Sequence, residues 1–562
     1  MMKAKVSKLA LACALVLQGA AFPALAGEQT RVAPQPQAVP QVWAQATAPM
    51  PRPHRPNILV IIADDVGLDL VPGMYPGLME RLTARYGADG FNHPQVGRIN
   101  GHPASTPSLN RMAQQGMVFR QAWAHPFCSP SRASMLTGLA ASKTHVATYA
   151  DALSQSHHSF VADLRDQAGY STAVFGKWHM AGLPGQPRVY PGMKPAEAGF
   201  DYFRGSMHAA LPTYWDYRVQ VQDQATGRDT WRDEAPRPHS LPGIRPTLLA
   251  DVGWASDALD WIRQREAADP DKPWFTWLAF NLAHATIRQD PSAMMVPDRD
   301  TLDEPTRREI EACGGQYGSQ NVGSCSGETL MRAMTNAMDT IIGRVLDEVD
   351  RLDPDTYVIF MGDNGTPMYG RPNLDFIDNM YITRVGRGKS SAYEGGAHVP
   401  LAIRGPGIGH GLQSDEFVHV TDLFATILQM AALPVPSQVP NSAGTGSEMI
   451  DAVSLMPILD GATAQVRDPQ TDFIITESTN LMADSIKVVG VRNARYKVVC
   501  VQQATNCEFY DLASDPLEEY PLPRPDTCSA PMDAAQPEWN YCRLAGVAAS
   551  RSILTGTPRA TR

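Results

Sequence analysis

Residues 58–65 read ILVIIADD, from Ile58 to Asp65, and this stretch decides the fold class. Its first six residues are apolar without alternation, which is typical of a strand buried on both faces of a parallel sheet. Asp64 and Asp65 follow at the point where such a strand ends. Ligands of open α/β sheets bind beyond the carboxyl ends of the strands, so we expect both carboxylates to lie at a ligand site.

Three further apolar runs end in polar side chains in the same way. Amphipathic stretches such as residues 328–352 separate them, and this alternation predicts an α/β fold with a largely parallel central sheet flanked by helices. We therefore expect the polar side chains to meet at one edge of the sheet. The runs are 171–175, followed by Lys177 and His179; 274–280, followed by His284; and 357–361, followed by Asp363 and Asn364.

The composition is that of a large, exported globular protein. The 562 residues are 43% hydrophobic and 19% charged, which suits one large domain and a smaller one. Residues 1–26 have the lysines, the apolar run and the Ala24-Leu25-Ala26 site of a secretory signal peptide. We expect an exported protein, periplasmic or secreted, without stable membrane insertion, because the apolar run is too short to span a bilayer. Cleavage leaves 45 basic and 58 acidic side chains, which disfavours nucleic acid as a partner.

The chain divides into five predicted parts. Residues 27–55 are rich in Pro, Ala and Gln and predict a flexible leader. The catalytic α/β domain is expected at 56–435, and a Pro-, Ser- and Gly-rich segment ends it. Short strands at 473–477, 487–492, 496–501 and 508–512 predict a small antiparallel C-terminal subdomain at 436–530. The remainder, 531–562, is a tail, and from 521 onward we expect only loop.

Cysteine usage fits an oxidising compartment. Cys13 leaves with the signal peptide, and Cys128 lies in the motif described next, so six cysteines remain. Six cysteines allow fifteen pairings, and proximity in the sequence favours three local bridges. These are Cys313 with Cys325, Cys500 with Cys507, and Cys528 with Cys542.

Residues 128–138, CSPSRASMLTG, place Cys128 before a short predicted helix. Pro130 suits the first helical position and Gly138 the residue after the helix end. Backbone amides at a helix N-terminus favour an anion, and Arg132 adds a guanidinium that grips an oxyanion or orients the nucleophile. A free cysteine is usually an inert core residue, but the polar neighbours disfavour that reading. The short spacing between Cys128 and Arg132 excludes a cysteine phosphatase loop.

The same eleven residues match the Cys-x-Pro-Ser-Arg-x-x-x-Leu-Thr-Gly signature of type I sulfatases, and the chain resembles that family over roughly residues 56–520. The resemblance implies an alkaline-phosphatase-like fold with a small C-terminal antiparallel subdomain. It also implies that a formylglycine-generating or anaerobic sulfatase-maturing enzyme converts Cys128 to formylglycine. A small-molecule or glycan sulfate ester would then be cleaved to an alcohol or phenol and inorganic sulfate through a formylglycine-sulfate intermediate.

The acidic residues at the strand ends predict a metal site. Asp64, Asp65, Asp363 and Asn364 offer only oxygen donors, which select Ca²⁺ or Mg²⁺ over Zn²⁺. Either motif alone is explained by a helix cap or a turn. The resemblance implies one divalent cation, calcium in the first place and magnesium as the alternative, next to the formylglycine at Cys128.

The remaining site residues follow from the resemblance. Residues 169–179, GYSTAVFGKWH, are similar to a second sulfatase signature, in which Lys177 binds sulfate and His179 is the general base. Lys389, in the segment GKSSAYEGG at 388–396, corresponds to a second sulfate-binding lysine. His284 corresponds to a sulfate ligand and proton donor, although the segment departs from the family's His-x-Pro pattern. His398 stands where the family often has arginine, and we read it as structural.

We therefore expect a sulfatase that acts on an aryl or carbohydrate sulfate. Two alternatives stay open: a phosphonate or phosphate ester hydrolase on the same fold, and an inactive anion- or glycan-binding protein that retains the Cys128 thiol. The sequence does not name the substrate. Selectivity is expected in the loops at 69–103, 204–246 and 313–325.

Overall fold

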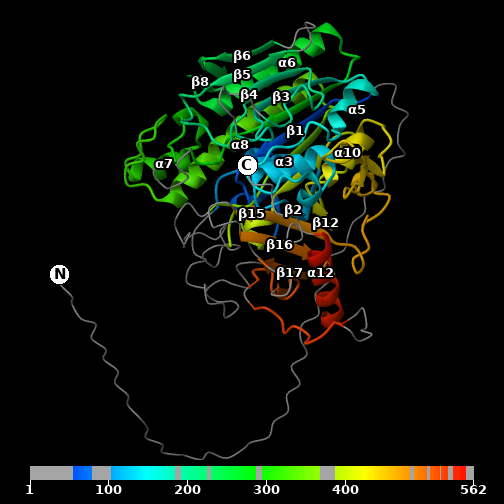
Figure 1. The fold of residues 1–562 in the computed structure, drawn as a ribbon. Coiled ribbons are helices and arrows are strands. Elements are labelled where there is room, and N and C mark those ends of the chain that lie inside the picture. The colour runs from blue at the N-terminus through cyan, green and yellow to red at the C-terminus, as the bar shows by residue number, and fades with distance from the viewer. Residues whose placement is uncertain are drawn as a thin grey trace, which may run out of the picture. The chain divides into compact units, whose positions relative to one another are not determined.

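A ten-stranded, mostly parallel sheet forms the centre of the molecule (Figure 1). The computed structural model describes residues 55–78, 103–183, 191–223, 230–286, 294–367, 387–480, 486–502, 507–518, 520–528 and 536–551; the predicted signal peptide lies outside them. The four apolar runs form neighbouring strands at the centre of the sheet, as predicted. In sheet order the strands are β12 (Leu412–His419), β2 (Met117–Trp123), β11 (Leu401–Arg404), β10 (Tyr357–Gly362), β1 (Ile58–Ala63), β9 (Trp274–Ala279), β3 (Ser171–Lys177), β4 (Tyr202–Ser206), β5 (Val219–Asp223) and β6 (Thr230–Glu234).

Helices cover both faces of this sheet, which explains why β1 is apolar throughout. Leu59 and Ile61 pack into one core, whereas Val60 and Ile62 pack into the other. Successive side chains of a strand point to opposite faces, so β1 needs apolar residues at every position. The first core is completed by α2 (Pro107–Gln114), α6 (Ala250–Ala268) and α8 (Gly327–Leu352), and the second by α3 (Cys128–Thr137), α5 (Phe160–Asp166), α10 (Asp422–Met430) and α11 (Met456–Leu459).

The segment expected to be a selectivity loop at 204–246 contains several strands. Strand β5 extends the central sheet antiparallel to β4, and β6 pairs antiparallel with β5. Strand β7 (His239–Leu241) pairs with β8 (Ile244–Thr247) in a separate hairpin. The expectation of a loop was wrong over these strands because β5, for example, reads VQVQD, and such an alternating strand lacks the continuous apolar run of the central strands. Much of the other expected loop, 69–103, lies outside the described residues.

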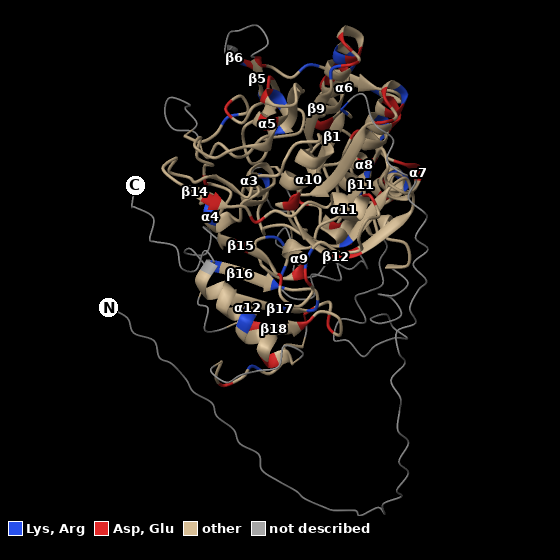
Figure 2. Ribbon diagram, turned by 90° about the vertical axis from the view of Figure 1, so that its right-hand side faces the viewer, with Lys and Arg blue, Asp and Glu red and all other residues tan. Residues whose placement is uncertain are grey.

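The C-terminal region forms a separate four-stranded antiparallel sheet, as predicted. Its order is β15 (Ile474–Asn480), β16 (Ile486–Arg492), β17 (Tyr496–Val501) and β18 (Cys507–Asp511). The prediction of loop alone after residue 521 was wrong, because α12 (Pro537–Arg551) packs on this sheet (Figure 2). Tyr541, Leu544 and Ala548 recur at helical spacing and are buried against β17 and β18.

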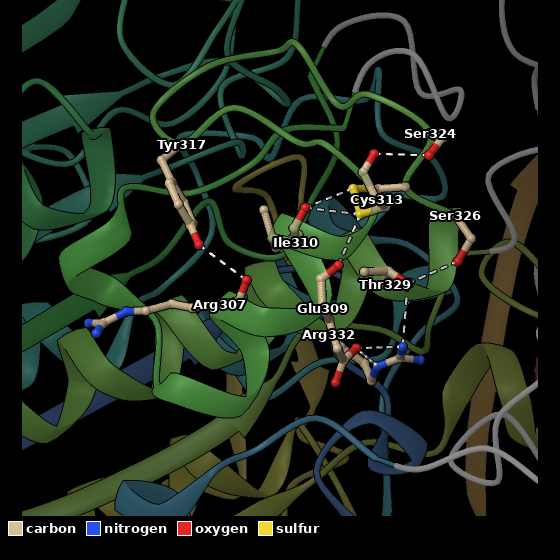
Figure 3. The surroundings of a disulfide bond; sticks show 10 residues. Arg307, Glu309, Ile310, Cys313, Tyr317, Ser324, Ser326, Thr329 and Arg332 are labelled. Atoms are coloured by element: carbon tan, nitrogen blue, oxygen red, sulfur yellow. Dashed lines mark hydrogen bonds and ion pairs between the residues drawn. A yellow bond between two sulfur atoms is a disulfide. The ribbon is translucent and has the colours of Figure 1, made fainter.

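All three predicted disulfides are present: Cys313–Cys325, Cys500–Cys507 and Cys528–Cys542. The first closes the loop that follows α7 (Glu304–Ala312), as Figure 3 shows. Cys128 is the one free cysteine in the described part of the chain. Among the described helices, none combines the length and apolarity needed to cross a bilayer.

Candidate active site

Neighbouring strands bring the four predicted metal ligands together. In the parallel pair β1 and β10, Ala63 lies opposite Gly362. The next residues of the two strands, Asp64 with Asp65 and Asp363 with Asn364, therefore occupy the same edge of the sheet. All four are fully buried. On the other side of β1, β9 leads to His284, and β3 ends at Lys177.

Helix α3 presents Cys128 to this edge. The helix begins at Cys128 itself, not at Pro130 as the sequence indicated, because Phe127 is the extended residue before it. The positive end of the helix dipole therefore lies at Cys128. Cys128 is only 1% exposed. Gly138 ends the helix in the left-handed conformation, with φ 70°, as predicted.

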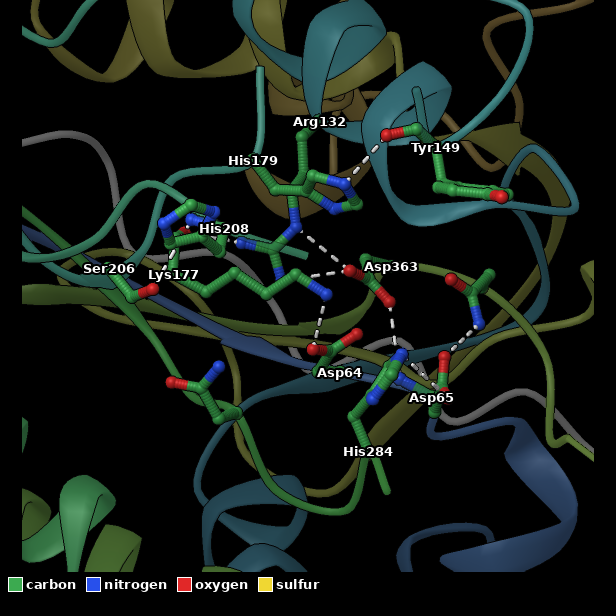
Figure 4. A network of polar contacts seen from close by, with 12 residues as sticks. Asp64, Asp65, Arg132, Tyr149, Lys177, His179, Ser206, His208, His284 and Asp363 are labelled. Carbon is green, nitrogen blue, oxygen red and sulfur yellow. Dashed lines mark hydrogen bonds and ion pairs between the residues drawn. The ribbon is translucent and has the colours of Figure 1, made fainter. Parts of the chain in front are cut away.

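Three ion pairs link the sequence-predicted residues, and Figure 4 shows the pairs made by Arg132 and Lys177. The Arg132 guanidinium contacts Asp363 Oδ2 through Nε at 2.9 Å and through its second terminal nitrogen at 2.8 Å. Lys177 Nζ lies 2.6 Å from Asp64 Oδ2. Lys389 pairs with Asp65 Oδ1. The cluster thus balances three carboxylates with three cations around the start of α3.

His179 is held in one tautomer by the backbone. Its Nε2 lies 2.8 Å from the Tyr149 carbonyl, which can only accept, so Nε2 carries the proton. Its Nδ1 is buried and has no hydrogen-bond partner among the described residues. Burial, with Lys177 and Arg132 nearby, lowers the pKa of His179 well below its usual value. The imidazole is therefore neutral, and Nδ1 has a free lone pair that can accept a proton.

His284 is oriented in the opposite sense. Its Nδ1 lies 2.5 Å from the Ala285 carbonyl and so donates to it, which leaves Nε2 facing Asp65 Oδ2 at 3.6 Å. Burial lowers the pKa of His284 to about 3, although Asp65 acts to raise it. His284 thus joins the cluster even without the expected neighbouring proline.

Burial also sets the protonation of the other groups. It raises the pKa of the Cys128 thiol, so the thiolate is disfavoured at neutral pH. It raises the pKa values of Asp64 and Asp363 as well. Burial opposes ionisation of Asp65, but His284 and Lys389 outweigh it and lower its pKa. The protein surrounds Cys128 with charge yet does not activate it as a thiolate.

The residues present fit a divalent cation. Asp64 Oδ1 and Asn364 Oδ1 are buried acceptors with no hydrogen-bond partner in the described structure. The Asn364 amide nitrogen donates to Asp65 Oδ1 at 2.8 Å and to the Gly365 carbonyl, which leaves its oxygen free. Ligand atoms of Asp64, Cys128 and Asp363 lie within 4.8 Å of one another. This oxygen-rich set suits calcium or magnesium.

Several supporting residues carried no sequence signal. The Tyr214 hydroxyl lies 2.6 Å from each of the carbonyl oxygens of Asn281 and His284 and donates its one hydrogen between them. Asp251, on α6, accepts from the Asn281 amide at 2.6 Å. These contacts fix the segment after β9 that carries His284. His398 contacts the Arg120 carbonyl at 2.9 Å and stacks on Trp123, which agrees with a structural role.

Comparison with known proteins assigns the class. The sulfatase family model matches residues 56–433, which is more than half of the chain. The protein therefore belongs to the sulfatase family and is a sulfuric ester hydrolase.

Individual relatives agree with this assignment. The chain is 26% identical to the N-acetylgalactosamine-6-sulfatase of Canis lupus familiaris over 428 residues, which cover 73% of this chain and 67% of the relative. Among solved structures, a putative sulfatase of Bacteroides fragilis is 18% identical, with TM-score 0.56 over 84% of this chain and 92% of that one. A phosphonate monoester hydrolase of Agrobacterium radiobacter is 20% identical, with TM-score 0.51, over 83% and 90%. The two structures share the fold.

Proposed function

We propose that the protein hydrolyses a sulfate monoester to an alcohol or phenol and inorganic sulfate, with residue 128 converted from cysteine to formylglycine. The position of Cys128 carries this proposal. It begins a helix at the edge of the sheet, among Arg132, Lys177, Lys389 and three carboxylates. The raised thiol pKa makes an unmodified Cys128 a poor nucleophile, whereas the hydrated aldehyde supplies a hydroxyl that attacks sulfur.

The cations around residue 128 bind the substrate sulfate. Lys177 and Lys389 carry positive charge into a buried site, where attraction to an anionic sulfate is stronger than in water. Arg132 donates to Asp363 and, at 2.6 Å, to the Lys177 carbonyl. Arg132 therefore links Asp363 to the backbone of Lys177.

The two histidines divide the proton transfers. His179 takes a proton through Nδ1, because Nε2 is engaged with the Tyr149 carbonyl. His284 delivers a proton to the leaving oxygen through Nε2, because Nδ1 is engaged with the Ala285 carbonyl. The negative charge of a bound sulfate favours the protonated His284 ring.

The free oxygens of Asp64 and Asn364, with Asp65 and Asp363, would hold one divalent cation beside residue 128. Calcium is proposed as this ion, with magnesium as the alternative, because the donors are hard oxygens. A bound cation would polarise the sulfate ester and offset developing negative charge. Its two charges would also replace those of Lys177 and Lys389 beside Asp64 and Asp65 when the lysines turn to the substrate, while Arg132 stays paired with Asp363.

The relationship to N-acetylgalactosamine-6-sulfatase favours a carbohydrate sulfate as substrate, and an aryl sulfate is the second candidate. We further propose export to the periplasm or medium, since three disulfides need an oxidising compartment. The partner that oxidises Cys128 is a formylglycine-generating or anaerobic sulfatase-maturing enzyme.

The test is hydrolysis of matched aryl esters by the purified protein. We expect 4-nitrophenyl sulfate to be cleaved with a higher kcat/KM than 4-nitrophenyl phosphate or phenylphosphonate, and Cys128→Ala to abolish turnover. A strong preference for phosphate or phosphonate would contradict the proposal. A panel of sugar, steroid and choline sulfates then identifies the natural class.

A further inference from the structure

The segment that carries Lys389 is attached to the C-terminal sheet. Five residues after Lys389, Glu394 begins the short helix α9 (Glu394–Ala397), and its side chain is almost fully buried. Glu394 Oε1 lies 2.7 Å from Nζ of Lys497, which is on β17. The indole nitrogen of Trp123 donates to the same carboxylate at 3.0 Å.

Lys497 holds Glu394 a second time, through Glu518. Lys497 Nζ lies 2.9 Å from Glu518 Oε1, and Glu518 Oε2 accepts from the Glu394 backbone amide at 2.7 Å. One buried ammonium thus fixes both the side chain and the backbone of Glu394. Lys497 and Glu518 are each 1% exposed.

The other end of the segment has matching contacts. Arg387 donates to the Glu518 carbonyl and, at 3.1 Å, to the Tyr510 hydroxyl of β18. Between the two ends, the Ser390 amide donates to the Pro126 carbonyl at 3.0 Å, two residues before Cys128. Residues 387–394 are therefore held to the C-terminal sheet at both ends and to the Cys128 segment in the middle.

The charge balance makes Lys497 the critical member of this network. Buried carboxylates are costly unless a cation and hydrogen bonds compensate them. Lys497 lies between two of them, Glu394 and Glu518. Without its ammonium, the attraction that holds Glu394 and Glu518 together is lost, so we expect the segment to shift from the position that sets Lys389 against Asp65.

We propose that Lys497, in the C-terminal sheet, is a positioning residue that holds Lys389 at the sulfate site through Glu394 and Glu518. This inference rests on the proposed function, in which Lys389 binds sulfate. The C-terminal sheet then contributes to catalysis, because it positions one of the two lysines that bind the substrate sulfate. A displacement of Lys389 by about 1 Å lowers the rate on the order of 100-fold.

The experiment combines Lys497→Met with Lys389→Ala in a double-mutant cycle. With 4-nitrophenyl sulfate, we expect Lys497→Met to lower kcat/KM by about 10- to 100-fold in the normal background. In the Lys389→Ala background it should change kcat/KM less than about twofold, because its effect passes through Lys389. If the double variant lowers kcat/KM by the product of the two single-variant factors, the two residues act independently and the proposal is overturned.

Arg467→Met is the matched control, because Arg467 is a buried cation paired with Asp422 at 2.6 Å, outside the Lys389 network. It should lower the melting temperature comparably and leave kcat/KM nearly unchanged. If Arg467→Met loses as much activity as Lys497→Met, the effect of Lys497 reflects stability alone and the positioning role is refuted. If Lys497→Met does not fold, the isosteric Glu518→Gln enters the same cycle, with the same expected pattern and the same refuting result.

A second readout separates this inference from the proposed function. Calorimetry with inorganic sulfate measures the anion site without turnover, and Lys497→Met should weaken sulfate binding as Lys389→Ala does. Normal turnover with unchanged kcat/KM and sulfate affinity in Lys497→Met would refute the positioning role alone. Absence of sulfatase turnover in the unaltered protein would refute the proposed function.

Discussion

Replacing Asp363 by Asn separates the structural from the metal-binding role of the buried acids. Asp363 Oδ2 receives two contacts from Arg132, at 2.9 and 2.8 Å, and both side chains are fully buried. Asp363→Asn leaves the Arg132 guanidinium without its counter-charge, a change that costs about 3–5 kcal/mol in buried pairs. Asp422→Asn is the matched control, since Asp422 binds Arg467 through two hydrogen bonds at 2.8 and 2.6 Å.

Thermal unfolding with excess chelator or with calcium provides the assay. Both variants should unfold at lower temperature in chelator than the unaltered protein. Calcium at 100 times its Kd stabilises a folded protein by about 2.7 kcal/mol, and we expect Asp422→Asn to keep this gain. Asp363→Asn should lose most of it, together with activity. Equal calcium-induced shifts in the two variants would refute the assignment of Asp363 as a ligand.

Three further changes test other parts of the structure. His284→Ala should slow hydrolysis of a sugar sulfate by about 10²–10⁴-fold and affect 4-nitrophenyl sulfate much less, because nitrophenolate leaves without a proton; equal losses on both substrates would contradict its role as proton donor. Gly205→Ala places a Cβ 1.9 Å from the Gly176 carbonyl, so β3 must shift, with a loss of at least about 1–3 kcal/mol in chemical denaturation and reduced activity; unchanged stability would contradict the close packing of β3 and β4. Replacing Cys528 and Cys542 by Ser should lower the free energy of unfolding by about 3 kcal/mol. Reductant should speed hydrogen exchange in α12 of the unaltered protein and have no effect on α12 in this variant. If reductant still speeds exchange in the variant, another disulfide stabilises α12.

The sequence predicted the edge of the sheet well because buried parallel strands have a strong pattern. The apolar runs before Asp64 and Asp363 mark β1 and β10, and their pairing follows from the α/β topology. The sequence also predicted a helix directly after Cys128, with Pro130 in its first position, whereas the helix of the structure begins at Cys128. The local disulfides followed from proximity alone.

The contacts that orient these side chains could not be predicted. The tautomers of His179 and His284 depend on the carbonyls of Tyr149 and Ala285, and a carbonyl has no sequence signal. Lys497 reaches Glu394 across 103 residues, a pairing that appears only when α9 packs on the C-terminal sheet. Strand β6 was missed because Trp231 is its only large apolar residue. Helix α12 did carry a signal, the helical spacing of Tyr541, Leu544 and Ala548, which the prediction overlooked.

The mass of peptide 121–132 tests the central claim most directly. Trypsin cleaves after Arg120 and Arg132, which isolates residue 128 from every other cysteine. In protein with measured sulfatase turnover, this account predicts the mass of the aldehyde or its hydrate and reaction with a carbonyl reagent. A fully active preparation whose peptide carries only the free thiol would contradict it.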